Sequence, residues 1–256
     1  MRFLAAFMLF AAALSGNEAY EIMKKVDRRD KGDLMIADVR MILIDGANRT
    51  RERKMRQFKQ EEGELIKRSI FFLEPSDVKD TGFLTFDRKK GEDDQWLYLP
   101  SLKKTKRISS SDQSGSFMGS DFSYNDLNDR NLDDYTYVLQ SEREINGAAC
   151  WVIEATPKNQ KVIEMTGYAR SLIVVRKDNF VISRAVNYEV KKGRAKFLDI
   201  PKLELIDGIW QPLELQMVVK QDNIVTHSTI LRFSDIRFNQ KIDGELFTIR
   251  GIERGL

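Results

Sequence analysis

The sequence predicts a mainly β, antiparallel domain with a few short helices. From residue 33 onward, short apolar and β-branched runs follow one another closely. Turn dipeptides separate several of them, including Asp45–Gly46, Asn146–Gly147 and Asp207–Gly208. Asparagine followed by glycine between two apolar runs is a strong hairpin signal. No glycine- and proline-rich linker divides the chain, so we expect one domain over residues 18–256.

The first residues have the pattern of a secretory signal peptide. Arg2 precedes an apolar run over residues 3–14, and small residues lead to a cleavage position after Ser15. The run is about 12 residues long, whereas a helix that spans a bilayer needs roughly 20. We therefore expect residues 1–15 to be cleaved and the mature protein to be soluble.

Residues 18–30 predict a short amphipathic helix that packs on a sheet. Tyr20, Met23 and Val26 follow one another at intervals of three, Ile22 and Val26 are four apart, and all four share one helical face. Gly32 ends the pattern.

The predicted strands follow in chain order. They cover residues 33–45, 49–61, 65–73, 83–86, 95–99, 135–145, 149–156, 167–176, 180–191, 195–206, 209–219 and 224–238. Around ten strands joined by short turns imply an antiparallel meander. A last segment, residues 243–249, is expected to be helical or extended.

Some strands are apolar on both faces. In the run 95–99, Trp96 and Tyr98 share one face, while Leu97 and Leu99 share the other. An antiparallel strand buried on both faces needs two covers. One cover could be the N-terminal helix, and the other could be the opposite wall of a barrel or half-barrel. The pattern leaves a barrel with a ligand cavity and a β-sandwich with a solid core equally open.

The segment after residue 100 is unusual for a loop. A serine-rich stretch, residues 109–116, leads to Phe117, Met118 and Phe122 in a glycine- and serine-rich context. Each large apolar side chain would cost roughly 1.5–3 kcal/mol if it stayed in water. These side chains should therefore insert into the body, either as a lid over a cavity or as a loop held to the core.

Candidate catalytic residues are scarce. His227 is the only histidine and lies in a predicted strand without a supporting nucleophile pattern. Cys150 is the only cysteine, lies in an apolar stretch and is expected to be buried. Two such residues are too few for a zinc site. We therefore expect no catalytic residues, no metal and no cofactor, and a protein that is not an enzyme.

The charge balance argues against nucleic acid as a partner. The chain has 42 basic and 39 acidic residues, a net charge of +3, whereas nucleic-acid-binding surfaces show a strong basic excess. Two short segments are locally basic, Arg49–Arg56 and Lys103–Arg107.

Four motifs match a family of exported proteins. They are VDRRDKGD at 26–33, FFLEPSDVKDTGFL at 71–84, DDQWLYLP at 93–100 and RISSSDQSGSFMGSDFSYNDL at 107–127. On these motifs the chain resembles the outer membrane lipoprotein-sorting protein family, a LolA-like group in Gram-negative bacteria. The resemblance covers about residues 18–254.

The resemblance implies an open antiparallel half-barrel of about eleven strands, LolA- or LolB-like, closed by a few short helices. It implies a soluble periplasmic carrier that binds the acyl chains of a lipoprotein or lipid in an apolar cavity, for trafficking to the outer membrane. An inner-membrane exporter and an outer-membrane acceptor would be its partners. The candidate cavity or lid residues are Phe71, Phe83, Trp96, Tyr98, Phe117, Met118 and Phe122.

The alternative is a non-enzymatic adaptor subunit of an envelope lipid-export complex. Its interior would be filled, and its basic segments, Arg49–Arg56 and Lys103–Arg107, would dock a partner. A cavity lined by apolar groups favours the carrier, whereas a solid core with an exposed patch favours the adaptor.

Overall fold

A computed structural model describes the backbone of residues 3–256 and the side chains of residues 16–256. The predicted signal peptide, residues 1–15, lies outside the part whose side chains are described. The helices are α1 (Phe3–Arg28), α2 (Gln160–Thr166) and α3 (Ile249–Arg254), with short 3-10 turns η1 (Pro100–Leu102), η2 (Ser110–Asp112), η3 (Phe117–Gly119), η4 (Asn125–Leu127), η5 (Leu132–Asp134) and η6 (Gly244–Phe247). Among the described residues, no helix is both long and apolar enough to cross a membrane.

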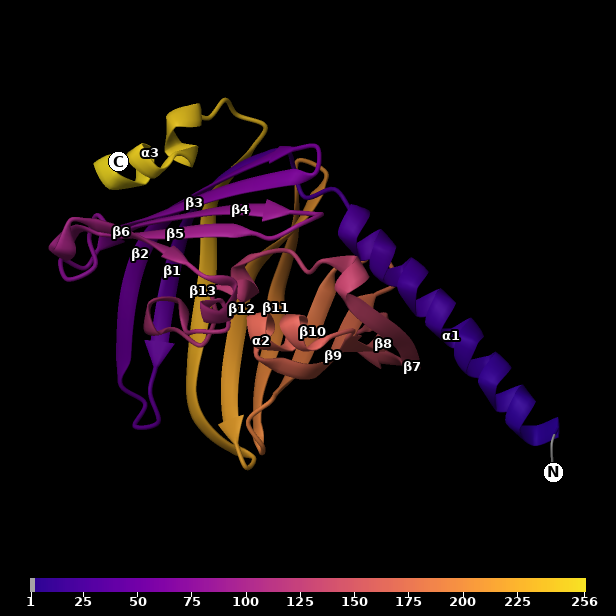
Figure 1. Cartoon of the computed structure of the whole chain (residues 1–256). Helices are drawn as coiled ribbons and strands as arrows, with labels where there is room; N and C mark the ends of the chain where they lie inside the picture. The colour runs from indigo at the N-terminus through magenta and orange to yellow at the C-terminus, as the bar shows by residue number, and fades with distance from the viewer. Residues whose placement is uncertain (1–2) are drawn as a thin grey trace.

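Thirteen strands form one antiparallel sheet that does not close (Figure 1). They are β1 (Leu34–Ile44), β2 (Thr50–Glu62), β3 (Leu65–Glu74), β4 (Gly82–Arg88), β5 (Asp94–Leu99), β6 (Lys104–Ile108), β7 (Tyr135–Ile145), β8 (Ala148–Pro157), β9 (Tyr168–Arg176), β10 (Ile182–Glu189), β11 (Arg194–Ile206), β12 (Ile209–Gln221) and β13 (Ile224–Phe238). The mainly β, open half-barrel is confirmed. The sheet has more strands than the roughly eleven that the resemblance implies.

The sheet consists of two meanders that meet at one pair of strands. Its order is β6-β5-β4-β3-β2-β1-β13-β12-β11-β10-β9-β8-β7, so β1 pairs with β13 and the edges are β6 and β7. In Figure 1, strands β3, β4 and β5 run nearly across the direction of β11, β12 and β13. The sheet therefore curves around one face, which we call the inner face.

Turn chemistry fixes the hairpins that the sequence predicts. Asn146 and Gly147 have φ values of 53° and 75°, and Asp207 and Gly208 have φ values of 51° and 83°. Two consecutive residues with positive φ form the turn whose twist matches paired strands, and Asn, Asp and Gly adopt it at the lowest cost.

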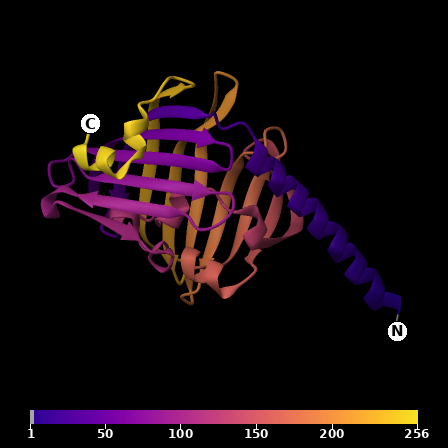
Figure 2. The ribbon, with the colours of Figure 1, turned by 45° about the horizontal axis from the view of Figure 1, so that its top comes forward.

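Strands β3–β5 are covered on both faces, as the sequence predicts. Ile70 and Phe72 point to the inner face, whereas Phe71 packs outward with Leu84 and Ile252. The outer cover is the C-terminal η6–α3 segment, which lies over these strands in Figure 2. The N-terminal helix is therefore not the cover of these strands.

The N-terminal helix packs at the other end of the sheet. The predicted amphipathic segment 18–30 is the last part of α1, which ends at Arg28. Ile22, Met23 and Val26 are buried against tyrosines of β7 and apolar side chains of β8 and β9. The predicted buried face of this helix is thus confirmed, and Cys150 is also buried as predicted.

The contact between α3 and β4 gives a first prediction. A Cβ atom at Gly82 would lie 2.6 Å from the carbonyl oxygen of Ile252 and 2.7 Å from its Cβ atom. Both atoms belong to a packed helix, so we expect Gly82→Ala to cost about 1–3 kcal/mol in urea unfolding. Gly244→Ala is the matched control because nothing lies within 4 Å of its added Cβ. An equal loss in both variants would contradict this account of the α3 contact.

Candidate ligand-binding cavity

The inner face is crossed by the segment that joins the two edge strands. Residues 109–134, which we call the plug segment, connect β6 to β7 and carry η2 to η5. Because these strands lie at opposite edges of the sheet, the connection has to cross its open side (Figure 1). The segment also bonds to itself: the Phe117 amide donates to the Phe122 carbonyl at 2.8 Å, and the Tyr124 amide donates to the Gly115 carbonyl at 3.0 Å.

Aromatic side chains hold the plug segment against the sheet. Phe117 is 1% exposed, and its ring centroid lies 5.1 Å from Phe83, 6.0 Å from Phe72 and 5.7 Å from Tyr124. Tilted and edge-to-face pairs at these separations add to the energy of apolar burial. The large apolar groups of this loop therefore insert into the body, as the sequence predicts.

A cavity of about 150 Å³ remains between the plug segment and the sheet. Its apolar lining residues are Val39, Met41, Met55, Ile70, Phe83, Phe117, Phe122, Leu127, Leu215, Leu231 and Phe233, and its polar lining residues are Gln57, Arg68, Thr85 and Asp126. Pockets for drug-sized ligands usually enclose about 300–1,000 Å³. A long acyl chain would therefore need the plug segment to move out of the inner face.

The structure brings together only some of the predicted site residues. Phe83, Phe117 and Phe122 line the cavity. Met118 is partly buried beside the same cluster, and its carbonyl oxygen accepts a hydrogen bond from Arg53.

The other predicted site residues lie elsewhere. Phe71, Trp96 and Tyr98 belong to the outer cluster under η6 and α3. The cavity instead includes residues that we did not predict, such as Val39 and Met41 of β1 and Leu231 of β13. Val39, Met41 and Leu43 alternate along β1 and therefore lie on one face of the strand. This alternation is the sequence pattern from which the apolar face of β1 could have been predicted.

Asp121 of the plug segment is held against β13 by polar contacts. The Thr229 hydroxyl donates to Asp121 Oδ2 at 2.6 Å and accepts from the Asp121 amide at 3.0 Å, while His227 Nδ1 contacts Asp121 Oδ1. His227 therefore has a partner that positions the plug segment. Within residues 16–256, no group of three or more His, Cys, Asp or Glu side chains is placed to hold a metal ion.

A second, more polar cavity of about 420 Å³ lies next to this contact. It is bounded by the plug segment and by the ends of strands β1, β2, β10, β11 and β13. Its lining residues are Leu43, Ile44, Asp45, Arg49, Arg51, Ser114, Ser116, Gly119, Ser120, Asp121, Glu189, Arg194, Lys196, His227, Ser228 and Thr229.

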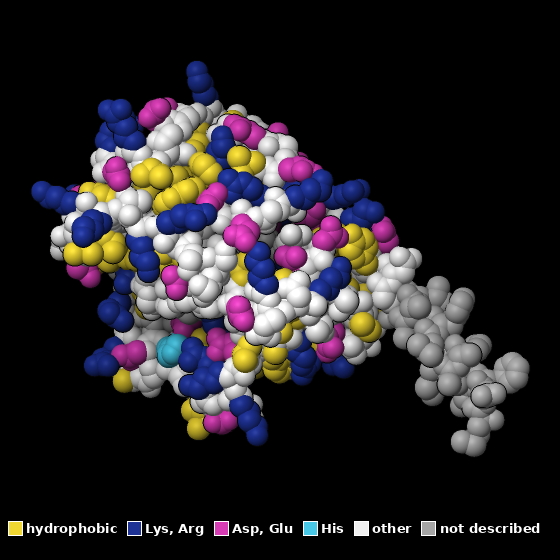
Figure 3. Space-filling model, in the orientation of Figure 1, with side chains coloured by type: hydrophobic (Ala, Val, Ile, Leu, Met, Phe, Trp, Pro, Cys, Tyr) yellow, Lys and Arg dark blue, Asp and Glu magenta, His cyan; other side chains and the backbone are white. Residues whose placement is uncertain are grey.

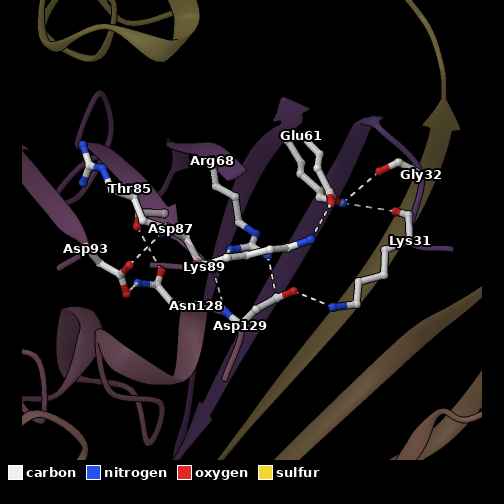
Figure 4. A network of polar contacts seen from close by, with 12 residues as sticks. Lys31, Gly32, Glu61, Arg68, Thr85, Asp87, Lys89, Asp93, Asn128 and Asp129 are labelled. Carbon is white, nitrogen blue, oxygen red and sulfur yellow. Dashed lines mark hydrogen bonds and ion pairs between the residues drawn. The ribbon is translucent and has the colours of Figure 1, made fainter. Parts of the chain in front are cut away.

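A buried ionic network holds Asp129, near the C-terminal end of the plug segment, against the sheet (Figure 4). Arg68 of β3 donates to Asp87 of β4 at 3.1 Å and to Asp129 of the plug segment at 2.7 Å. Lys31, in the link between α1 and β1, donates to the second oxygen of Asp129 at 2.5 Å. The Asp129 amide also donates to Asp87 at 2.7 Å. The link between α1 and β1, the sheet and the plug segment thus meet at one carboxylate.

The two carboxylates of this network differ in proton affinity. Burial and the nearby negative charges of Asp129 and Asp93 raise the pKa of Asp87, and the positive charge of Arg68 lowers it. The raising effects are larger, so the pKa of Asp87 rises to about 6. Burial also acts to raise the pKa of Asp129, but Arg68 and Lys31 outweigh it and hold that pKa well below its ordinary value. Asp129 is therefore the carboxylate whose charge stabilises the network.

Comparison with known proteins supports the same fold over nearly the whole chain. A family model described as "-like: Uncharacterized protein" matches residues 65–254. A domain from Vibrio parahaemolyticus described as an outer membrane lipoprotein-sorting protein is 31% identical, with a TM-score of 0.85, 93% of this chain covered and 100% of that chain. No curated protein matches the sequence.

Two further solved structures are similar. A DUF1329 family protein from Desulfovibrio piger is 28% identical, with a TM-score of 0.85 and coverage of 93% of this chain and 99% of that one. A LolA superfamily protein from Nitrosomonas europaea is 21% identical, with a TM-score of 0.67 and coverage of 91% and 98%, and shows the fold alone. The chain therefore belongs to the outer membrane lipoprotein-sorting protein family.

Proposed function

We propose that the protein is a carrier that shelters the acyl chains of a lipid or lipoprotein on its inner face. The observation that carries this proposal is an apolar cavity covered by one connecting segment rather than by a strand of the sheet. Such a segment can leave the inner face without breaking the strand ladder. Each methylene group that enters contributes about 0.8 kcal/mol, so a long chain can replace the apolar contacts of the plug segment.

The route of the cargo is part of the proposal. We propose that the protein works in the periplasm after removal of residues 1–15, receives its cargo from an inner-membrane exporter and delivers it to an outer-membrane acceptor. The relative from Vibrio parahaemolyticus, described as a lipoprotein-sorting domain, supports this assignment. No covalent step is needed, because transfer between two apolar sites is sufficient.

The direct test is to purify the protein from the periplasm without detergent and to analyse its organic extract and native mass. Bound lipid or acylated peptide in a one-to-one ratio is expected and would identify the cargo class. A protein that is reproducibly empty and takes up no fluorescent fatty acid would favour the adaptor instead.

A cavity-filling variant gives a second prediction. Val39 is 4% exposed and lines the cavity. We expect Val39→Phe to weaken fluorescent fatty acid binding by about tenfold or more, because the added ring occupies the space of several methylene groups. Val138→Phe is the control, because Val138 is 40% exposed on the edge strand β7. Equal affinity of both variants would contradict the placement of the ligand in this cavity.

A further inference from the structure

We propose that one end of the half-barrel docks on a membrane surface that contains anionic lipids. This surface, which we call the tip surface, consists of residues 45–51, 189–196 and 220–225. The proposal goes beyond the carrier function and does not depend on the identity of the cargo.

Three hairpins end together at the tip surface. Ile44 at the end of β1 pairs with Ser228 of β13, and Gln221 at the end of β12 pairs with both Ile224 and Arg194. The Asp222 amide donates to the Gly193 carbonyl at 2.8 Å, so adjacent turns are joined directly. In Figure 1 these turns lie at the lower end of the sheet. Side chains on them therefore form one continuous surface.

Apolar side chains project from these turns into solvent. Val190 is 62% exposed, Ile224 is 70% exposed and Val225 is 53% exposed. Residues beside tight turns are usually small or polar, so three branched apolar groups at adjacent hairpin ends are unusual. Asp222 and Asn223 have φ values of 51° and 65°, which is the geometry of a tight hairpin turn. Ile224 and Val225 are therefore presented from a fixed position.

The tip surface is also basic. Its three segments contain seven Lys and Arg residues, of which Lys196 is buried, but only three Asp and Glu residues, whereas the whole chain has a net charge of +3. Arg51, Lys191 and Lys192 are exposed, and none of them has an ion pair within the described part of the chain. Figure 3 shows basic and hydrophobic side chains side by side at this lower end.

This combination fits a lipid surface better than an acidic protein. Shallow insertion of apolar groups together with basic residues near the headgroups is how peripheral proteins bind anionic bilayers. Three exposed apolar side chains offer little apolar area for a protein interface, which typically buries about 800 Å² on each partner. The exposed Arg49 and Arg51 also line the more polar cavity. A docked protein would therefore present the edge of that cavity to lipid headgroups.

The test uses protein purified from the periplasm and two kinds of vesicle. One is made of phosphatidylcholine alone, and the other of equal parts of phosphatidylcholine and phosphatidylglycerol. In co-sedimentation we expect binding to the anionic vesicles to be about tenfold stronger, and to weaken as the salt concentration rises.

Variants separate the two contributions. Ile224→Ser/Val225→Ser and Lys191→Gln/Lys192→Gln should each weaken anionic vesicle binding by about fivefold or more. Leu205→Ser is the matched control, because Leu205 is 52% exposed near the opposite end of the sheet, where β11 turns into β12. Since all these side chains are exposed, unfolding curves should stay close to that of the unchanged protein.

The outcomes are decisive in either direction. Absent binding to anionic vesicles, or an equal loss in Leu205→Ser, would overturn the proposal. So would retention of binding by both double variants. Uptake of a fluorescent fatty acid without vesicles is measured separately and should be unchanged in these variants. A protein that binds vesicles but takes up no fatty acid would refute the carrier function while supporting the tip surface.

Discussion

Phe117→Ala is expected to destabilise the protein by about 3–5 kcal/mol and, at the same time, to make room for a larger ligand. The loss follows from removing a ring that is 1% exposed and packs on Phe72, Phe83 and Tyr124. The gain follows from its position, because Phe117 lines the cavity from the side of the plug segment. In the proposed carrier function, an acyl chain would take the space that this ring occupies.

The two effects are measured by urea unfolding with and without a long-chain fatty acid. A ligand that binds only the folded state stabilises it, so added fatty acid should recover more stability in Phe117→Ala than in the unchanged protein. Phe247→Ala is the control: Phe247 is 4% exposed but packs in the outer cluster. We expect a comparable loss of stability there and no change in ligand affinity. Weaker fatty acid binding by Phe117→Ala than by Phe247→Ala would show that Phe117 does not occupy the ligand's space.

Strand positions could be predicted because Asn, Asp and Gly residues at the turns mark where one strand ends and the next begins. Residues 224–238 were predicted as a strand and form β13 with the same bounds. In contrast, β6 was missed because its sequence, KTKRI, has no apolar alternation and four of its residues are basic or polar. Such charged edge strands avoid pairing with other chains. Helix α2 was also missed, although Asn159 caps its start and Gly167, with a φ of 76°, ends it.

The position of the cavity could be predicted only in part. Alternation shows that Trp96 and Tyr98 share a face and that Leu97 lies on the other, but it does not say which face is the inner one. That choice depends on which distant segment covers each face. Here the C-terminal segment covers Trp96 and Tyr98, while the plug segment covers Leu97. The aromatic residues of the plug segment were identifiable because a loop cannot leave such side chains in water.

Asp129→Asn and Asp87→Asn are expected to have very different effects, although both remove one carboxylate from Arg68. Asp129 contacts both Arg68 and Lys31, so its neutralisation leaves Arg68 with Asp87 as its remaining carboxylate and Lys31 without a carboxylate partner among the described residues. Removing one partner of a buried ion pair typically costs about 3–5 kcal/mol. The plug segment is fastened through this residue, so we also expect faster hydrogen exchange of its amides in Asp129→Asn.

The charge of Asp87, unlike that of Asp129, is expected to lower the stability of the folded protein, because burial disfavours the charged carboxylate. Folding raises its pKa from the ordinary 3.8 to about 6, so the folded protein holds a proton that the unfolded chain has lost. Stability should therefore fall by about 3 kcal/mol as the pH rises from roughly 4 to above 6. Asp87→Asn removes this contribution and keeps an oxygen that can accept from the Asp129 amide. We expect it to be nearly neutral at pH 7 and to flatten the pH dependence over that range.

Urea unfolding of the unchanged protein and both variants across this pH range provides the measurement. The difference between the unchanged protein and Asp87→Asn isolates one carboxylate from all the others that titrate in the same range. For Asp129 the sign is reversed: its stabilising charge is fully present above its unfolded pKa and is lost only under more acidic conditions. If Asp87→Asn proved as destabilising as Asp129→Asn at pH 7, the two carboxylates would be equivalent partners of Arg68. Fastening of the plug segment could then not be assigned to Asp129 alone.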